Sequence, residues 1–385
     1  MTKRLARRRG AALLTAVTLT AVTLIGLTAC SAPSNASSIR SDGGLKASAA
    51  TSAADLGGMA ALVKAAKEEG TLTVIALPPD WANYGDVIKG FQARYGLKVN
   101  SASPGASSPA EITEARTLRG QPTAPDVFDL SGQVASANLA MFAPYRVLRF
   151  NDVPAPLKDP TGLAVSDYGG FMSIGYDADK VPAPKTVADL LKPAYKGKVA
   201  LNGDPTRTGS GFSGVVMTAL SRGGTPDDIS RGVSFFKSLK TAGNFVPVDP
   251  TGATIESGQT PVVLDWDYLN VATAKKVVGT SDWRTVVPPG AVVGGYYVQA
   301  INLDAPHPAA ARLWEEYLYS DEGQNLWLRG GVRPVRESAM VAAGTIDKAA
   351  HSALPDAAGA TVFLTKAQQD KAMAYLRANW AKALG

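Results

Sequence analysis

Short apolar runs alternate with helical patterns along much of the sequence, which limits the chain to an α/β fold. Residues 72–76 and 126–130 are two predicted strands, and apolar residues with helical spacing lie between them. This order predicts a parallel sheet whose strands are joined by right-handed crossover helices. A second unit with the same alternation lies between residues 172 and 290, and a long strand expected over 292–303 returns the chain to the first unit. Two lobes joined in this way form a cleft that can close like a hinge.

A chain of 385 residues is long enough for two domains. The expected fold class is α/β, with two lobes, two mixed sheets flanked by helices, and a two-strand hinge. The first lobe is predicted to comprise residues 55–171 and 295–345, and the second lobe residues 172–294 and 346–385. Residues 30–54 are rich in Ser, Ala and Gly, so we expect a flexible tether there.

Residues 1–29 carry the apparent basicity of the chain. The whole chain has a net charge of +6, but removing the five basic residues of this segment leaves 34 basic against 33 acidic residues, a net charge of +1. A remainder so close to neutral argues against a nucleic-acid partner. Basic residues followed by an apolar run and small residues are typical of a signal peptide, and this run is shorter than the ~20 residues of a membrane-spanning helix.

Cys30 is the only cysteine, so the sequence excludes an internal disulfide and a cysteine-based metal site. Leu27, Thr28 and Ala29 precede it, and the four residues together resemble a bacterial lipobox, whose cysteine is lipidated. The alternative is that Cys30 is an unmodified cysteine that lies by chance beside an ordinary signal-peptide cleavage site. Lipid on Cys30 would anchor the protein to a membrane.

The sequence contains few groups suited to catalysis. It has two histidines, neither in a recognisable motif, and it has no serine-hydrolase elbow, Walker loop or zinc-protease motif. Asp265 and Asp267 could act as acid and base, but alternation along an extended strand would place both on one side, with Trp266 on the other. We predict no catalytic residue, no cofactor and no metal site. A lipid-anchored hydrolase is the less favoured class.

The stretch 261–270 is a candidate binding site. Four apolar residues, typical of a strand buried on both faces, run directly into Asp265, Trp266, Asp267 and Tyr268. Ligands of open α/β sheets bind at the carboxyl ends of strands, so two acids beside an indole indicate a cleft for something small. The alternative is a strand that enters a polar turn, with Trp266 packed in the core.

Residues 204–211 are a candidate anion site. Hydroxyl groups of Thr206 and Thr208, glycine amides and an expected helix N-terminus together could hold a phosphonate, phosphate or carboxylate. Simple helix capping by Thr208 or Ser210 would explain the same residues, and both interpretations stay open here.

Four stretches resemble bacterial extracellular solute-binding proteins of ABC importers, in the group that includes iron, polyamine and phosphonate binders. They are residues 69–74, 190–199, 204–211 and 309–324, which read EGTLTV, LLKPAYKGKV, DPTRTGSG and AAARLWEEYLYSDEGQ. The resemblance implies a two-lobed type II periplasmic-binding-protein fold and a small-molecule solute. It also implies a membrane permease and its ATPase as partners, a monomeric state, and a lipid-anchored position on the extracellular face of the membrane.

Resemblance to the polyamine binders suggests which residues hold the solute. Trp81, Asn83 and Tyr84 resemble their Trp-x-Glu-Tyr segment, with Asn83 departing from the acid, and Tyr297 stands where those proteins place an aspartate. Trp266 falls near a ligand-stacking tryptophan, and Asp204 near an amine-binding aspartate. The full set of predicted ligand-binding residues is Trp81, Asn83, Tyr84, Ser131, Asp204, Thr206, Thr208, Asp265, Trp266, Asp267 and Tyr297.

These residues favour an amine-bearing organic solute, either a polyamine or a zwitterionic amine such as an aminophosphonate. The alternative is ferric iron. The ferric binders carry a Tyr-Tyr pair just after the strand equivalent to 261–265, and here that pair reads Asp267 and Tyr268. Two adjacent tyrosines, Tyr296 and Tyr297, do occur, but they lie in the strand expected over 292–303.

Overall fold

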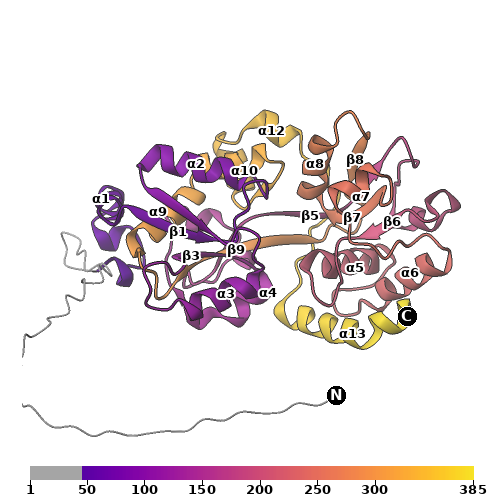
Figure 1. Cartoon of the computed structure of the whole chain (residues 1–385), viewed down its shortest axis with the longest axis horizontal. Coiled ribbons are helices and arrows are strands. Elements are labelled where there is room, and N and C mark those ends of the chain that lie inside the picture. Colours follow the sequence, from indigo (N-terminus) through magenta and orange to yellow (C-terminus); the bar gives the residue numbers. More distant parts are fainter. Residues whose placement is uncertain (1–45) are drawn as a thin grey trace, which may run out of the picture. The chain divides into compact units, whose positions relative to one another are not determined.

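The computed structural model describes residues 46–385, in which helices flank mixed β-sheets (Figure 1). The strands are β1 (Thr71–Ile75), β2 (Lys98–Ala102), β3 (Val127–Ser131), β4 (Phe142–Ala143), β5 (Val165–Asp177), β6 (Val199–Leu201), β7 (Val262–Trp266), β8 (Trp283–Val286), β9 (Gly294–Asn302) and β10 (Arg333–Pro334). The helices are α1 (Met59–Glu69), α2 (Tyr84–Tyr95), α3 (Ser108–Thr117), α4 (Gly132–Ala137), α5 (Gly209–Ser221), α6 (Ser230–Thr241), α7 (Gly252–Glu256), α8 (Asp267–Lys276), α9 (Pro308–Leu318), α10 (Asp321–Arg329), α11 (Glu337–Ala343), α12 (Lys348–Ser352) and α13 (Lys366–Leu384).

The strands form one continuous path in the order β3-β9-β5-β7-β6, with β4 on β9 and both β8 and β10 on β5. A separate parallel pair consists of β1 and β2. Parallel pairing of β6 with β7 and antiparallel pairing of β5 with β7 and β9 make the larger sheet mixed, as the sequence predicts. The predicted parallel sheet of the first unit is limited to β1 and β2, because β3 pairs antiparallel with β9 instead.

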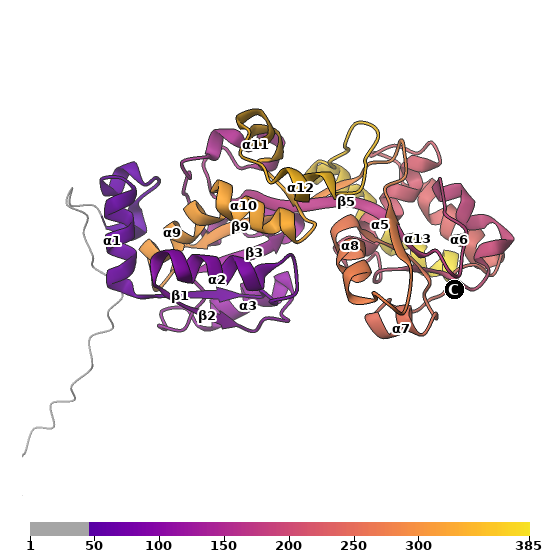
Figure 2. The same cartoon turned by 90° about the horizontal axis from the view of Figure 1, so that it is seen from above.

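The strand β5 links the two halves of this path. Its residues up to Phe171 pair with β9, whereas those from Met172 onward pair with β7 and β8. The chain from β8 to β9 runs back beside it, and the two segments cross together between the elements around β3 and those around α5 and α6 (Figures 1 and 2). This arrangement is the predicted two-strand hinge.

The lobe boundaries stay a prediction. Around residue 171 the change of partners along β5 supports the proposed division. We propose to move the last boundary from 345 to about 355. The reason is that Ile346 and Leu354 pack with Leu328 of α10 in one apolar cluster.

Residues 46–54 differ from the expected tether. Ala47, Ala50 and Ala53 are buried. The buried guanidinium of Arg312 in α9 donates to the carbonyl oxygens of Ala50, at 2.9 Å, and Ser48, at 3.0 Å. Small side chains allow this backbone to approach α9 closely, and its carbonyls satisfy a charge that would otherwise be costly to bury. The predicted signal peptide over 1–29, Cys30 and the rest of the predicted tether lie outside the described residues.

Candidate functional site

A cleft with a volume of about 920 Å³ is lined by both halves of the sheet. Side chains from the loop after β1, the end of β3, the N-terminus of α5, β9 and α13 surround it. A volume of ~300–1,000 Å³ is usual for small-molecule sites. Six of the predicted ligand-binding residues line this cleft: Trp81, Ser131, Thr206, Thr208, Trp266 and Tyr297.

Aromatic rings form one wall of the cleft, and each is held by other side chains. Trp81 donates its indole N–H to the hydroxyl of Tyr168 at 2.9 Å, and its ring lies edge-on to Tyr297 at 5.8 Å between centroids. Tyr297 stacks on Tyr168 at 5.4 Å. Trp266 lies parallel to Tyr268 at 6.5 Å. Rings fixed in this way can receive an apolar or cationic group with little loss of side-chain freedom.

Trp266 approaches the hinge closely because residue 295 is a glycine. A Cβ atom added to Gly295 would lie 2.2 Å from the indole ring. The strand β9 therefore leaves room for the ring at the point where it enters the cleft. Trp266 is 8% exposed, so it is both a core residue and part of the cleft wall.

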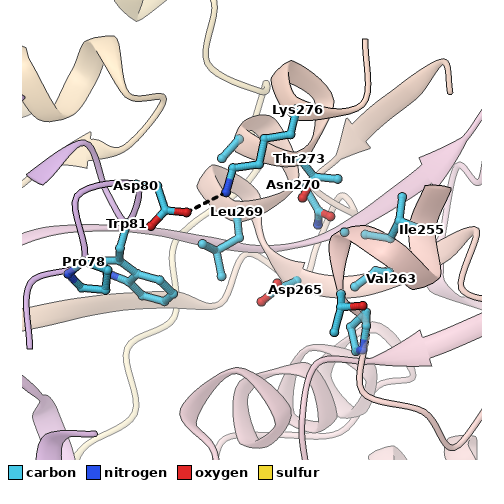
Figure 3. A pocket seen from close by; sticks show the side chains of 14 residues that line it. Pro78, Asp80, Trp81, Ile255, Val263, Asp265, Leu269, Asn270, Thr273 and Lys276 are labelled. Atoms are coloured by element: carbon cyan, nitrogen blue, oxygen red, sulfur yellow. Dashed lines mark hydrogen bonds and ion pairs between the residues drawn. The ribbon is translucent and has the colours of Figure 1, made fainter. Parts of the chain in front are cut away.

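Asp265 lines a second, smaller cavity of about 220 Å³ (Figure 3), whereas Trp266 lines only the larger cleft. Trp81 lines this cavity too, and an ion pair between Asp80 and Lys276, 3.0 Å apart, lies beside it. The carboxylate of Asp265 accepts hydrogen bonds from the backbone N–H of Trp266 and the amide of Asn202, both at 2.8 Å. Burial raises the pKa of Asp265 to about 7.

Asp267 does not lie on the same side as Asp265, contrary to the prediction from strand alternation. The strand ends at Trp266 and α8 begins at Asp267, so the alternation stops there. Asp267 is fully buried, pairs with Arg333 at 3.0 Å, and accepts from the backbone N–H of Phe171 at 3.0 Å. Its carboxylate has a structural role and lines neither cavity.

Tyr84 and Asn83 also differ from their predicted role. Tyr84 begins α2, and its side chain lies on the same buried helix face as Val87 and Phe91. The Tyr84 hydroxyl accepts from the Gln299 amide at 3.0 Å. Asn83 instead donates to the carbonyl of Leu326 at 2.8 Å, which ties the start of α2 to α10. Neither residue lines the cavities.

The turn before α5 combines capping with exposure to the cleft. Asp204 is exposed and accepts from the backbone N–H and the hydroxyl of Thr206, at 2.8 and 2.7 Å, so it stabilises the turn and does not line the cleft. Thr208 caps α5 by accepting from the N–H of Gly211 at 3.2 Å. The capping interpretation is therefore correct for Thr208, while Thr206, Thr208 and Ser210 still line the cleft.

Two acids that the sequence prediction missed line the same cleft. Asp129 of β3 accepts from the hydroxyl of Tyr168 at 2.9 Å, and its backbone N–H donates to Glu111 of α3 at 3.0 Å. Burial raises the pKa of Asp129 to about 7 and that of Glu111 well above its ordinary value. Asp129 could have been predicted from the sequence, because it lies near the end of a strand, as Asp265 does. Glu111 lies in a helix, and its position in the sequence does not indicate that it lines the cleft.

The family model described as "Bacterial extracellular solute-binding protein" matches residues 135–358 of the chain. The chain belongs to this family. It is the substrate-binding subunit of an ABC importer and not an enzyme, and the predicted type II periplasmic-binding-protein fold is confirmed. Such subunits bind a small solute and act with a permease and its ATPase. Within residues 46–385, no helix of this solute-binding protein has both the length and the apolar character needed to span a bilayer.

Solved structures share the fold at low sequence identity. An extracellular solute-binding protein from Bordetella parapertussis is 16% identical with a TM-score of 0.63, covering 83% of this chain and 100% of its own. Iron-bound HitA from Pseudomonas aeruginosa is 19% identical with a TM-score of 0.57, covering 82% and 99%. AfuA from Actinobacillus pleuropneumoniae, with fructose-6-phosphate bound, is 16% identical with a TM-score of 0.56, covering 82% and 97%. No curated protein matches the sequence.

Buried acids make the stability of this solute-binding protein depend on pH. Burial raises the pKa of Asp129 and Asp265 to about 7 and that of Glu315 to about 8, above their values in the unfolded chain. The folded state therefore holds more protons than the unfolded state between these two sets of pKa values. The contribution of these acids to the free energy of unfolding is fully present below about pH 4 and is lost as the pH rises through 7 to 8. We expect the melting temperature without ligand to drop by several degrees between about pH 5 and 8.

A buffer series in differential scanning fluorimetry tests this. Asp265→Asn should reduce the drop in melting temperature between pH 5 and 8. The same change at the exposed Asp282 should leave this drop unchanged. A melting temperature that rises over this range would show that the buried acids stay ionised in the folded protein.

Proposed function

We propose that this subunit captures a small amine-bearing organic solute, either a polyamine or a zwitterionic amine such as an aminophosphonate. The observation that carries the proposal is the set of aromatic rings, Trp81, Trp266 and Tyr297, in one cleft with the buried acids Glu111 and Asp129. Aromatic faces attract organic cations, and carboxylates bind ammonium groups through charge-assisted hydrogen bonds. Binding would favour a closed state, in which both lobes contact the solute.

The α5 end of the cleft supports a zwitterionic solute in particular. The N-terminus of this helix carries a partial positive charge, and Arg207 and Arg377 also line the cleft. The hydroxyl of Thr206 lies there as well. These groups would hold the anionic end of an aminophosphonate, and the bound sugar phosphate of AfuA is consistent with an anion in a cleft of this fold.

Ferric iron stays the alternative solute, because HitA has the same fold with iron bound. Fe³⁺ prefers several anionic oxygen ligands. Tyr296 and Tyr297 line the larger cleft together with Glu111 and Asp129. Within residues 46–385, however, no group of three or more His, Cys, Asp or Glu side chains is placed to hold a metal ion, and Asp267 is already paired with Arg333. The organic amine is therefore the better fit to the side chains that face the cleft.

We also propose that Cys30 is lipidated and that the protein acts as a monomer anchored on the extracellular face of the membrane. The basic N-terminus, the apolar run and the Leu-Thr-Ala-Cys sequence support the lipid anchor, and the monomeric state follows from the resemblance alone. Metabolic labelling with a palmitate analogue tests it, since Cys30→Ala should abolish the labelling.

A thermal-shift panel tests the solute class. Spermidine, aminomethylphosphonate, amino acids, sugars and Fe³⁺ are compared on the purified protein. A ligand at a hundred times its Kd adds about 2.7 kcal/mol to the free energy of unfolding. We expect this stabilisation with one of the amines. A clear response to Fe³⁺ or a sugar, beside none to any amine, would contradict the proposal.

A further inference from the structure

A pair of buried carboxyl groups forms part of the cleft wall next to the aromatic rings. Glu111, on α3, is 1% exposed, and Asp129, on β3, is 5% exposed. Both line the cleft of about 920 Å³ together with Trp81 and Tyr297. The backbone N–H of Asp129 donates to Oε2 of Glu111 at 3.0 Å, which holds the Glu111 carboxyl against the strand.

The oxygen atoms of this pair are not all satisfied. In Asp129, Oδ2 accepts from the hydroxyl of Tyr168 at 2.9 Å and Oδ1 from the amide of Gln299 at 3.3 Å. Oε1 of Glu111 is buried and has no hydrogen-bond partner among the described residues. A buried acceptor without a partner costs about 1–3 kcal/mol, so such an atom calls for an explanation.

No positive side chain within residues 46–385 forms an ion pair with either acid. The buried Asp267, by contrast, is paired with Arg333. Buried charges in proteins are normally paired, and two adjacent acids without a cation are unfavourable. A cation brought by the ligand would supply both the missing charge and the missing donor.

We propose that Glu111 and Asp129 form the subsite for the ammonium group of the solute. The inference rests on the proposed function, because it assumes that the solute carries an amine. A primary ammonium fits better than a quaternary one, since Oε1 of Glu111 needs an N–H donor and a quaternary group has none. The subsite replaces Asp265 and Asp267, whose oxygens are occupied by Asn202, backbone N–H groups and Arg333.

Isothermal titration of Glu111→Gln with aminomethylphosphonate and spermidine tests the subsite. The substitution keeps the shape of the side chain but removes its charge, so we expect the Kd of the amine that binds to rise by about tenfold to a hundredfold. Glu114→Gln, the same change on the same helix at a residue outside the cleft, should leave the Kd unchanged. Asp129→Asn serves as a second variant if Glu111→Gln does not fold.

A comparison of ligands separates a direct contact from a structural role. Methylphosphonate lacks the amine of aminomethylphosphonate, so the wild type should bind it more weakly, whereas Glu111→Gln should discriminate far less between the two. For spermidine, the control is the melting temperature of Glu111→Gln without ligand. If Glu111 had only a structural role, the substitution would lower this melting temperature together with the affinity. If the wild type binds an amine and Glu111→Gln binds it equally well, the subsite is wrong although the proposed function stands. If the wild type binds no amine, both are wrong.

Discussion

Replacing Arg333 by methionine is expected to lower the free energy of unfolding by about 3–5 kcal/mol, because it leaves a buried carboxylate without its cation. The side chain of Asp267 is fully buried, and that of Arg333 is 8% exposed, with 3.0 Å between their polar atoms. The guanidinium of Arg333 also lies 4.3 Å from the ring centroid of Phe171. Burial raises the pKa of Asp267 even with Arg333 beside it, so losing the arginine would favour protonation or unfolding.

Denaturant unfolding of matched variants measures this loss. Arg329→Met breaks an ion pair with Asp347 whose arginine is 58% exposed, and should cost far less stability because solvent screens the pair. Asp267→Asn combined with Arg333→Met should recover much of the stability, because no charge is then left buried alone. Equal losses in Arg333→Met and Arg329→Met would mean that solvent reaches Asp267.

The same ion pair lies beside the proposed binding site. Asp267 follows Trp266 directly, and Arg333 belongs to β10, which pairs with β5 at Gly169. The pair therefore joins the end of β7 to the hinge strand. We expect Arg333→Met to weaken solute binding as well, since Trp266 loses the support of its neighbour.

Trp266→Ala is expected to weaken binding of the amine by at least about tenfold, because the indole is part of the cleft wall and can contact a cation. Its ring lies close to Gly295 and parallel to the ring of Tyr268. Removing it both deletes the contact and lets water into the space beside the hinge. The Kd from isothermal titration is the measurement, and Trp266→Phe should give an intermediate value.

Loss of stability must be separated from loss of binding in this experiment. Trp380→Ala removes another partly buried indole, which packs against Phe236 of α6 at 5.1 Å and lies outside the cleft. This control should lower the melting temperature without changing the Kd. An unchanged Kd in Trp266→Ala would assign Trp266 to the core alone, which is the alternative that the sequence left open.

The sequence by itself was sufficient to predict the mixed α/β fold, the hinge and the strand ends that carry Trp81, Ser131 and Trp266. These features are local, because strand and helix periodicity is set by neighbouring residues and because strand ends are where clefts form in α/β folds. The Leu-Thr-Ala-Cys sequence and its apolar run predict lipidation in the same local way.

Only the tertiary structure decided which side chains at those strand ends face the cleft. Asp267 turns away because α8 begins there and because Arg333, distant in the sequence, supplies its counter-charge. Glu111 faces the cleft because α3 packs on β3, where the N–H of Asp129 captures one of its oxygens. Such choices depend on partners that meet only after folding, so residue spacing cannot reveal them.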